Sequence, residues 1–214
     1  MRVVEFDKIG GPEVLRVVDR GTPAPGPGEI LIRQRAIGLN FIDTYFRTGL
    51  YPAPLPCVLG SEGSGVVEAV GQGVTRFRVG DRAAYAGGFG AYAQARPYPA
   101  DRAVRVPDGI SDEVAAAVML KGMTAEFLLH RCFKVQAGQS VLVHAAAGGV
   151  GSLLVQWAKA LGARVIGTAG SPEKAALAQA LGADEVVLYR EDNVAERVRA
   201  LTNGQGVAVV FDSV

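Results

Sequence analysis

Residues 140–151 have the types and spacing needed to bind phosphate groups. They read Ser-Val-Leu-Val-His-Ala-Ala-Ala-Gly-Gly-Val-Gly, a strand-like run followed by a glycine-rich turn. The turn matches the fingerprint Gly-x-Gly-x-x-Gly if Ala146 takes the first position, Gly148 the second and Gly151 the third. Gly148 would leave room for a pyrophosphate, and Gly151 would let a helix pack closely on the strand. The pattern therefore predicts a dinucleotide site with its phosphates at a helix N-terminus.

The elements around the turn support this prediction, because an isolated glycine fingerprint also occurs in ordinary α/β turns. The following residues include Leu153, Leu154, Trp157 and Leu161, which have the spacing of an amphipathic helix. A second strand-like run follows at 164–168. Strand, turn, helix and strand in this order form a βαβ unit, which favours the dinucleotide interpretation over the ordinary turn.

The end of the second strand predicts which dinucleotide binds. Folds that bind NAD place an acid about 20 residues after the glycines, where it holds the ribose 2′-hydroxyl. Here the strand ends in Thr168-Ala169-Gly170-Ser171, without an acid. Ser171, Lys174 and the N-terminus of a helix over 172–181 would attract a 2′-phosphate, and Glu173 would face elsewhere if Lys174 points at the cofactor. The sequence therefore favours NADPH, although Lys174 taken alone could be a solvent-exposed helix lysine.

Composition excludes several other classes of function. The 214 residues carry 22 basic and 21 acidic side chains, so there is no basic excess for a nucleic acid. Two cysteines, Cys57 and Cys132, and two histidines, His130 and His144, are too scattered for a structural zinc site. No apolar run reaches the roughly 18 residues of a membrane span, and the charged N-terminus is unlike a signal peptide. We therefore expect a reduced, metal-free, cytoplasmic protein.

The first half of the chain has the features of a β-rich domain. The expected strands are 2–6, 14–18, 29–39, 65–70 and 81–85. Turn residues such as Gly10-Gly11-Pro12 separate them, and Asn40 could cap a short helix over 41–46. Many short strands with Gly and Pro turns predict a barrel or a sandwich.

The second half has the alternation of a parallel α/β layer. A helical pattern starts at Ser111 and continues over 124–133, and strands then alternate with helices. The expected strands are 140–144, 164–168, 185–189 and 207–211, and the expected helices are 150–161, 172–181 and 193–201. Such units form a parallel sheet through right-handed crossovers. The change of pattern places a domain boundary within 120–138, and we set it between residues 123 and 124.

Several motifs together resemble one known family. They are Asn40-Phe41-Ile42-Asp43-Thr44-Tyr45, Gly60-Ser61-Glu62-Gly63-Ser64-Gly65, Lys121-Gly122-Met123-Thr124-Ala125, the turn ending at Gly151, and Tyr189-Arg190-Glu191-Asp192. From Met1 to Val214 the chain resembles the zinc-free quinone oxidoreductases, the zeta-crystallin-like branch of the medium-chain dehydrogenases/reductases. The resemblance implies an α/β fold, with a GroES-like β-rich substrate domain over 1–123 and a partial Rossmann doubly wound parallel sheet over 124–214. It also implies NADPH-dependent hydride transfer to a quinone or another α,β-unsaturated carbonyl.

The chain departs from the zinc-containing relatives of this family at their metal ligands. Those relatives have Gly-His-Glu where this chain has Gly60-Ser61-Glu62, and a cysteine ligand near the position of Asn40. They also carry a four-cysteine lobe where this chain continues with Ala86-Gly87-Gly88-Phe89-Gly90. We therefore expect no metal, so that a carbonyl cannot be polarised by zinc and catalysis depends on the hydride donor, geometry and a dry pocket.

The resemblance also implies a set of site residues. Cofactor contacts map onto Asn40, Ile42, Asp43, Tyr45, Thr124, Gly148, Gly149, Val150, Gly151, Ser171, Lys174 and Tyr189. Tyr45, Asn40 and Asp43 are the candidate catalytic residues, and Tyr45 would stack beside the nicotinamide or donate to a substrate oxygen. Alternatives remain: Tyr45 could anchor the short helix, and Asn40 and Asp43 could be cap and surface residues. Lys121 could reach a carbonyl or be only solvated.

The chain ends shortly after its expected fourth parallel strand, 207–211. By resemblance, later parts of the family complete the nicotinamide pocket and the first domain and form the homodimer edge. We therefore expect a C-terminally truncated member that lacks this edge. Two other functions stay open, namely an NADPH-binding fragment without catalysis and an enoyl-thioester reductase of the same superfamily.

Overall fold

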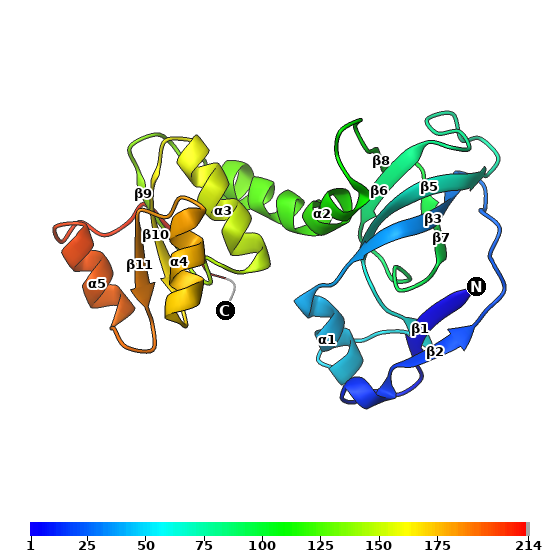
Figure 1. Ribbon diagram of the computed structural model, residues 1–214, viewed down its shortest axis with the longest axis horizontal. Helices are drawn as coiled ribbons and strands as arrows, with labels where there is room; N and C mark the ends of the chain where they lie inside the picture. The colour runs from blue at the N-terminus through cyan, green and yellow to red at the C-terminus, as the bar shows by residue number, and fades with distance from the viewer. Residues whose placement is uncertain (213–214) are drawn as a thin grey trace. The chain divides into compact units, whose positions relative to one another are not determined.

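The structure, a computed structural model, describes residues 1–212. The chain forms two compact units, Met1–Leu120 and Lys121–Val214. Each unit has its own sheets and its own hydrophobic core, and Figure 1 labels the helices and strands of both. None of the helices within the described residues is long and apolar enough to cross a membrane.

The first unit contains two antiparallel sheets. The smaller has the order β2-β1-β4, with β1 at Arg2–Phe6, β2 at Arg16–Asp19 and β4 at Cys57–Val58. The larger has the order β7-β3-β5-β6-β8, with β3 at Glu29–Gly38, β5 at Glu62–Val70, β6 at Arg82–Ala86, β7 at Ala95–Pro99 and β8 at Val104–Arg105. The register of β3 and β5 pairs Gly38 with Glu62, so Glu62 lies at the end of β3.

Three strands of this unit, β4, β7 and β8, were not predicted from the sequence, and each omission has an identifiable reason. β7 contains Pro97 and Pro99, which argue against a central strand, but β7 lies at the sheet edge where proline is tolerated. β4 and β8 contain two residues each, too few to show alternation. β5 starts at Glu62 rather than 65 because its glycines mark close packing and not a turn. A Cβ at Gly65 would overlap the backbone carbonyl of Arg33 on β3.

A short helix follows β3. The helix α1, Phe41–Thr48, begins after Asn40 and ends at Gly49, which has a left-handed φ of 82°. It is two residues longer than the expected 41–46, because the glycine that permits this C-cap lies at position 49. Residues Pro12–Val14 form a short 3-10 turn, η1, so β2 starts at Arg16 rather than at residue 14.

The second unit contains a four-stranded parallel sheet in the order β11-β10-β9-β12. Its strands are β9 at Ser140–Val143, β10 at Arg164–Ala169, β11 at Glu185–Leu188 and β12 at Val209–Phe211. Its connecting helices are α3 at Gly149–Ala160, α4 at Pro172–Ala180 and α5 at Val194–Leu201. This is the expected α/β layer. The strand order reverses between β9 and β12, because β10 and β11 extend the sheet on one side of β9 and β12 lies on the other side.

Helices cover both faces of this sheet. Val141, Val143 and Val165 share a core with residues of α3 and α4, including Leu154 and Ala178. The alternate strand residues Leu142, Ile166 and Val187 share a second core with Val194, Val198 and Leu201 of α5. Since successive strand residues point to opposite faces, α3 and α4 lie on one face and α5 on the other. Figure 1 shows the strands with these helices beside them, and the doubly wound arrangement is confirmed.

The helix before β9 changes its winding. The helix α2, Asp112–Glu126, continues as a π-helical segment, η2, at Phe127–Cys132. The sequence predicted a helix through Phe133 without this change. Leu129 is fully buried in the π-helical turn and belongs to the core beneath α3, so packing decides the local winding.

Candidate functional site

The glycine turn after β9 is closed by its own backbone. Gly148 N–H donates to the carbonyl oxygen of Ala145 at 2.7 Å. Ala145 has a φ of 48°, in the left-handed region that residues other than glycine seldom adopt. A Cβ at Gly151 would overlap that same Ala145 carbonyl, so only glycine allows α3 to approach the strand this closely. The close approach predicted at Gly151 is therefore present.

The start of α3 offers free donors at the turn. Gly148 occupies the N-cap and has no side chain to accept from the first helical N–H groups. The first N–H groups of an α-helix also lack partners within the helix. Gly148 and Gly149 are exposed, so these donors and the positive end of the helix dipole are open to an anion.

Lys121 lies beside the turn rather than in solvent alone. A Cβ at Gly149 would come within 2.9 Å of Lys121 Cδ and 3.0 Å of its Cε, so the aliphatic part of Lys121 lies beside Gly149. This places an ammonium-bearing chain next to the start of α3. Lys121 is partly buried. This is compatible both with a solvated lysine and with a role for Lys121 at the turn.

A second group of predicted residues gathers at the end of β10. Ser171 is the N-cap of α4, and its hydroxyl oxygen accepts from Lys174 N–H at 3.4 Å. A Cβ at Gly170 would come within 2.5 Å of the Tyr189 hydroxyl oxygen, so the Tyr189 ring lies beside this loop. Lys174 is exposed and Tyr189 half-exposed, and both can be reached from solvent.

Glu173 lies in the first turn of α4, next to Ser171 and Lys174. A hydrogen bond from the Ser171 hydroxyl and one from its own backbone lower the pKa of the Glu173 carboxyl. The first turn of a helix also stabilises a carboxylate, and Glu173 lies in the first turn of α4. The end of β10 therefore carries one carboxylate as well as Lys174.

Asn40 and Asp43 are buried at the start of α1, in the first unit. The Asp43 carboxylate accepts from Asn40 N–H at 3.0 Å and from the Tyr92 hydroxyl at 2.7 Å. Burial and this bond to Asp43 raise the pKa of Tyr92. Asn40 Nδ2 instead donates to Glu62 at 2.8 Å. Asp43 is thus a buried capping residue and not a surface residue, and Asn40 is both N-cap and partner of a buried carboxylate.

Tyr45 belongs to a group of aromatic rings on α1. Its ring lies 5.4 Å from Phe41 and 5.4 Å from Tyr51, in edge-to-face contact with both. Phe46 continues the contacts to Tyr51 and Phe89. Tyr45 is half-buried, whereas Phe41 is 74% exposed. The packing fits the helix-anchoring interpretation, and the exposed edges of the rings are available to a planar ligand.

The predicted residues therefore fall into two groups. Asn40, Ile42, Asp43 and Tyr45 lie in the first unit, at or in α1. Thr124 of α2, the turn Gly148–Gly151, Ser171, Lys174 and Tyr189 lie in the second unit. Sequence reasoning did not identify Thr168 of β10, whose side chain accepts a hydrogen bond from the turn. The sequence feature that could have indicated this role is a lone hydroxyl at the end of an apolar strand.

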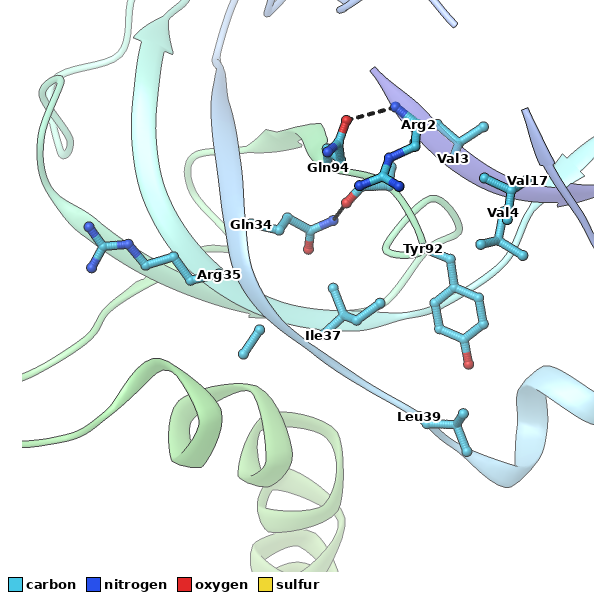
Figure 2. Close-up of a pocket in the computed structure, with 12 residues that line it drawn as sticks. Arg2, Val3, Val4, Val17, Gln34, Arg35, Ile37, Leu39, Tyr92 and Gln94 are labelled. Carbon is cyan, nitrogen blue, oxygen red and sulfur yellow. Dashed lines mark hydrogen bonds between the residues drawn. The ribbon is translucent and has the colours of Figure 1, made fainter. Parts of the chain in front are cut away.

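A groove of about 640 Å³ lies on the first unit, and its lining includes Leu39, which precedes Asn40, and Tyr92, which donates to Asp43. Apolar residues of β1, β2 and β3 line it, together with Tyr92 and the polar side chains of Arg2, Gln34 and Gln94. Figure 2 shows Gln94 accepting from the backbone N–H of Arg2 beside it. None of the predicted site residues lines this groove, so we do not assign it to the candidate site.

The donor set does not suit a metal. Among residues 1–212, no three His, Cys, Asp or Glu side chains are grouped so as to hold a metal ion. Cys57 is buried, and burial raises the pKa of its thiol to about 11, which disfavours the thiolate that metals bind. Cys132 is exposed, in the π-helical segment.

The sequence matches two known domain families. Residues 26–108 match the family described as alcohol dehydrogenase GroES-like domain, and residues 149–214 match the one described as zinc-binding dehydrogenase. The first match covers most of the β-rich unit, and the second starts within the glycine turn. Together they agree with a GroES-like domain followed by a Rossmann-like sheet.

Curated relatives and solved structures are similar over almost the whole chain. A quinone oxidoreductase of Pseudomonas aeruginosa is 56% identical over 99% of this chain and 66% of its own length. A quinone oxidoreductase of Escherichia coli solved with NADPH is 47% identical with a TM-score of 0.98, over 100% of this chain and 66% of its own. A mycobacterial protein solved with NADPH is 53% identical with a TM-score of 0.96, over 100% of this chain and 67% of its own.

The chain thus spans about two thirds of the length of the curated relatives it matches. Its fold, its two domain matches and identities of 48% to 56% to three named quinone oxidoreductases agree with one another. The chain belongs to the quinone oxidoreductase branch of the medium-chain dehydrogenase/reductase superfamily.

Proposed function

We propose that this protein is an NADPH-dependent oxidoreductase that transfers a hydride to a quinone or another α,β-unsaturated carbonyl without zinc. The observation that carries the proposal is the glycine turn between β9 and α3, whose backbone has no room for a side chain at Gly151. NADPH, when bound, supplies the hydride. The chain's own residues bind and orient the two reactants.

The second unit fits the dinucleotide. The pyrophosphate would lie over Gly148 and Gly149, where the N–H groups at the start of α3 are exposed. Ser171, Lys174 and Tyr189 would surround the adenosine 2′-phosphate. Ala169 occupies the strand end where an NAD site carries an acid. Glu173 limits this preference, because its carboxylate lies at the same loop and would favour a 2′-hydroxyl.

The first unit would hold the substrate, as domain 1–123, and the dinucleotide would bind domain 124–214. Tyr45 and the exposed ring of Phe41 offer an edge for a planar ring. Asn40 and Asp43 are the remaining candidates, with Ile42 between them. The geometry supports a supporting role for Asp43, since its carboxylate already accepts from Asn40 N–H and from Tyr92.

Zinc independence rests on donor chemistry. Zinc binds thiolates and imidazoles, whereas this chain has Asn40 and Ser61 at the corresponding positions. The amide of Asn40 donates to Glu62, which leaves neither group oriented as a metal ligand. An active site of this kind would place the carbonyl by hydrogen bonds and exclude water, without a Lewis acid.

Two measurements test the proposal. Calorimetry on the 214-residue chain should show NADPH binding at least tenfold tighter than NADH, and equal affinities would contradict the dinucleotide assignment. NADPH oxidation with 1,4-benzoquinone should then be measured for this chain and, in parallel, for the Pseudomonas aeruginosa relative. Turnover by both supports the full proposal. Binding without turnover, next to an active relative, would identify this chain as an NADPH-binding protein without catalysis.

A further inference from the structure

We propose that Thr168 is a positioning residue that holds the glycine turn in the conformation that binds pyrophosphate. The proposal rests on the proposed NADPH site. Thr168 lies near the carboxyl end of β10 and is 1% exposed, so it does not touch a ligand directly. It acts through the turn that follows the neighbouring strand, β9.

Two hydrogen bonds join Thr168 to consecutive N–H groups of the turn. Ala145 N–H donates to Thr168 Oγ1 at 3.3 Å, and Ala146 N–H donates to the Thr168 carbonyl oxygen at 3.0 Å. Any residue at 168 could make the carbonyl bond, whereas the first bond requires a side chain that can accept a hydrogen bond. The side chain of Thr168 therefore fixes one backbone group of the turn, the N–H of Ala145.

Ala145 is the residue of the turn that most needs to be fixed. Its φ of 48° is disfavoured for any residue with a Cβ. Its carbonyl oxygen accepts from Gly148 N–H at 2.7 Å and packs against Gly151. If Ala145 adopted a more favourable φ, its carbonyl oxygen would move. The hydrogen bond from Gly148 and the close packing of Gly151 against that oxygen would then be lost. The Thr168 hydroxyl holds the opposite end of the same residue.

The Thr168 hydroxyl also orients His144. Thr168 Oγ1 lies 3.1 Å from His144 Nδ1, and within residues 1–212 its partners are this nitrogen and Ala145 N–H. The hydroxyl accepts from Ala145 N–H with one lone pair, and its proton and second lone pair remain for His144 Nδ1, so the contact holds the ring in either tautomer. His144 N–H donates to the Phe211 carbonyl oxygen, so the ring lies at the carboxyl ends of the strands, where the strand order reverses. Ligands of open α/β sheets bind at this point.

The test compares variants of the 214-residue chain that differ only in the hydroxyl. Thr168→Val keeps the branched shape, and Thr168→Ser keeps the hydroxyl. We expect the Kd for NADPH, measured by calorimetry, to rise roughly tenfold in Thr168→Val and less than about twofold in Thr168→Ser. Equal Kd values in the three proteins would overturn the proposal. If Thr168→Val does not fold, Thr168→Ala replaces it, and the same gap from Thr168→Ser is required.

Thr202→Val is the matched control. Thr202 is also buried in the second unit, where its hydroxyl donates to the Val198 carbonyl at 2.7 Å and accepts from Gly206 N–H at 2.9 Å at the end of α5. Thr202→Val should lower the melting temperature as much as Thr168→Val and leave the Kd for NADPH unchanged. An equal loss of NADPH affinity in both variants would show that Thr168 contributes stability alone.

A double variant, in which Thr168→Val is combined with Ala145→Gly, tests the link to Ala145. Glycine adopts the left-handed region without a steric cost, so Ala145→Gly should reduce the effect of Thr168→Val from roughly tenfold to below about threefold. An unchanged tenfold effect would contradict the mechanism.

The contact of Thr168 with His144 is read by 15N NMR without any ligand. We expect the ring 15N shifts of His144 to change in Thr168→Val and to be retained in Thr168→Ser. This readout separates the two proposals: absence of NADPH binding by the wild type would refute the proposed function, and unchanged His144 shifts in Thr168→Val would refute the role of Thr168.

Discussion

The side-chain amide of Asn40 donates a hydrogen bond to Glu62 Oε1 at 2.8 Å in the interior of the first unit. The second carboxylate oxygen, Oε2, accepts from the N–H of Leu120 in α2 at 2.7 Å. One fully buried carboxylate therefore connects the start of α1 with the backbone of α2. The carboxylate is thus used for hydrogen bonding within the fold.

Replacement of Glu62 should weaken this connection. Glu62→Gln keeps the shape but replaces one acceptor oxygen by a donor, which cannot accept the bond from Asn40 Nδ2 or from Leu120 N–H at that position. We expect the free energy of unfolding to fall by about 2 kcal/mol, as for other buried hydrogen bonds to charged groups. Urea denaturation followed by circular dichroism measures it.

Glu68→Gln is the control for that variant. Glu68 lies on the same strand, β5, but its bond to Arg33 is at the surface and screened by water. Its effect should be much smaller than that of Glu62→Gln. Comparable losses in the two variants would mean that the buried position of Glu62 is not what makes it important.

A methyl group at Gly151 should disrupt the glycine turn. The Cβ of Gly151→Ala would overlap the Ala145 carbonyl, a backbone atom that can move only if the turn opens. We expect the Kd for NADPH to rise by about a hundredfold or more, and the free energy of unfolding to fall by about 2 kcal/mol. Gly21→Ala is the matched control, because nothing lies within 4 Å of the Cβ it would add. Undiminished NADPH affinity in Gly151→Ala would argue that the dinucleotide does not bind this turn.

The 2′-phosphate assignment predicts a difference between two cofactors. Lys174→Ala should weaken NADPH about tenfold or more and leave NADH nearly unchanged, since only NADPH carries the phosphate. Lys134→Ala, which removes another exposed lysine of the second unit, controls for the change of net charge. Titration of both cofactors into each variant provides the comparison. An equal loss of affinity for NADPH and NADH in Lys174→Ala would show that Lys174 does not contact the 2′-phosphate.

Asp184 should make the second unit sensitive to acid. Burial raises the pKa of its carboxyl, but hydrogen bonds from Lys159 and from Val165 N–H outweigh burial, and the pKa lies below its ordinary value of 3.8. A lowered pKa in the folded state stabilises the protein above the ordinary pKa, and this contribution is lost as the pH falls through the folded value. Asp184→Asn should therefore lower the melting temperature by several degrees at pH 7 and by less near pH 3.

Asp192→Asn provides the reference for the pH experiment. Asp192 is exposed, and its nearest ion-pair contact with Arg197 spans 3.9 Å. We expect its melting temperature to stay close to that of the wild type at both pH values. A gap between the wild type and Asp184→Asn that is the same at pH 7 and pH 3 would show that the ionised carboxylate is not the stabilising form.

Local sequence was sufficient for features that depend on neighbouring residues. The run Ser140–Val143 and the glycines after it predicted the strand, the turn and the start of α3, because strand apolarity, turn glycines and helix periodicity act over a few residues. The absence of an acid after β10 favoured NADPH on the same local basis. Local patterns failed at β7, whose prolines are tolerated because β7 lies at the edge of the sheet that residues 1–212 form.

Tertiary structure alone decided the contacts that join distant segments. The sequence placed Asp43 at the surface as one alternative and did not connect Asn40 with Glu62, since these two residues meet only through the register of β3 and β5. Thr168 binds Ala145 because parallel pairing sets the end of β10 beside the turn after β9. Strand order and register bring such groups together, and they depend on the summed packing of the whole sheet rather than on any one segment.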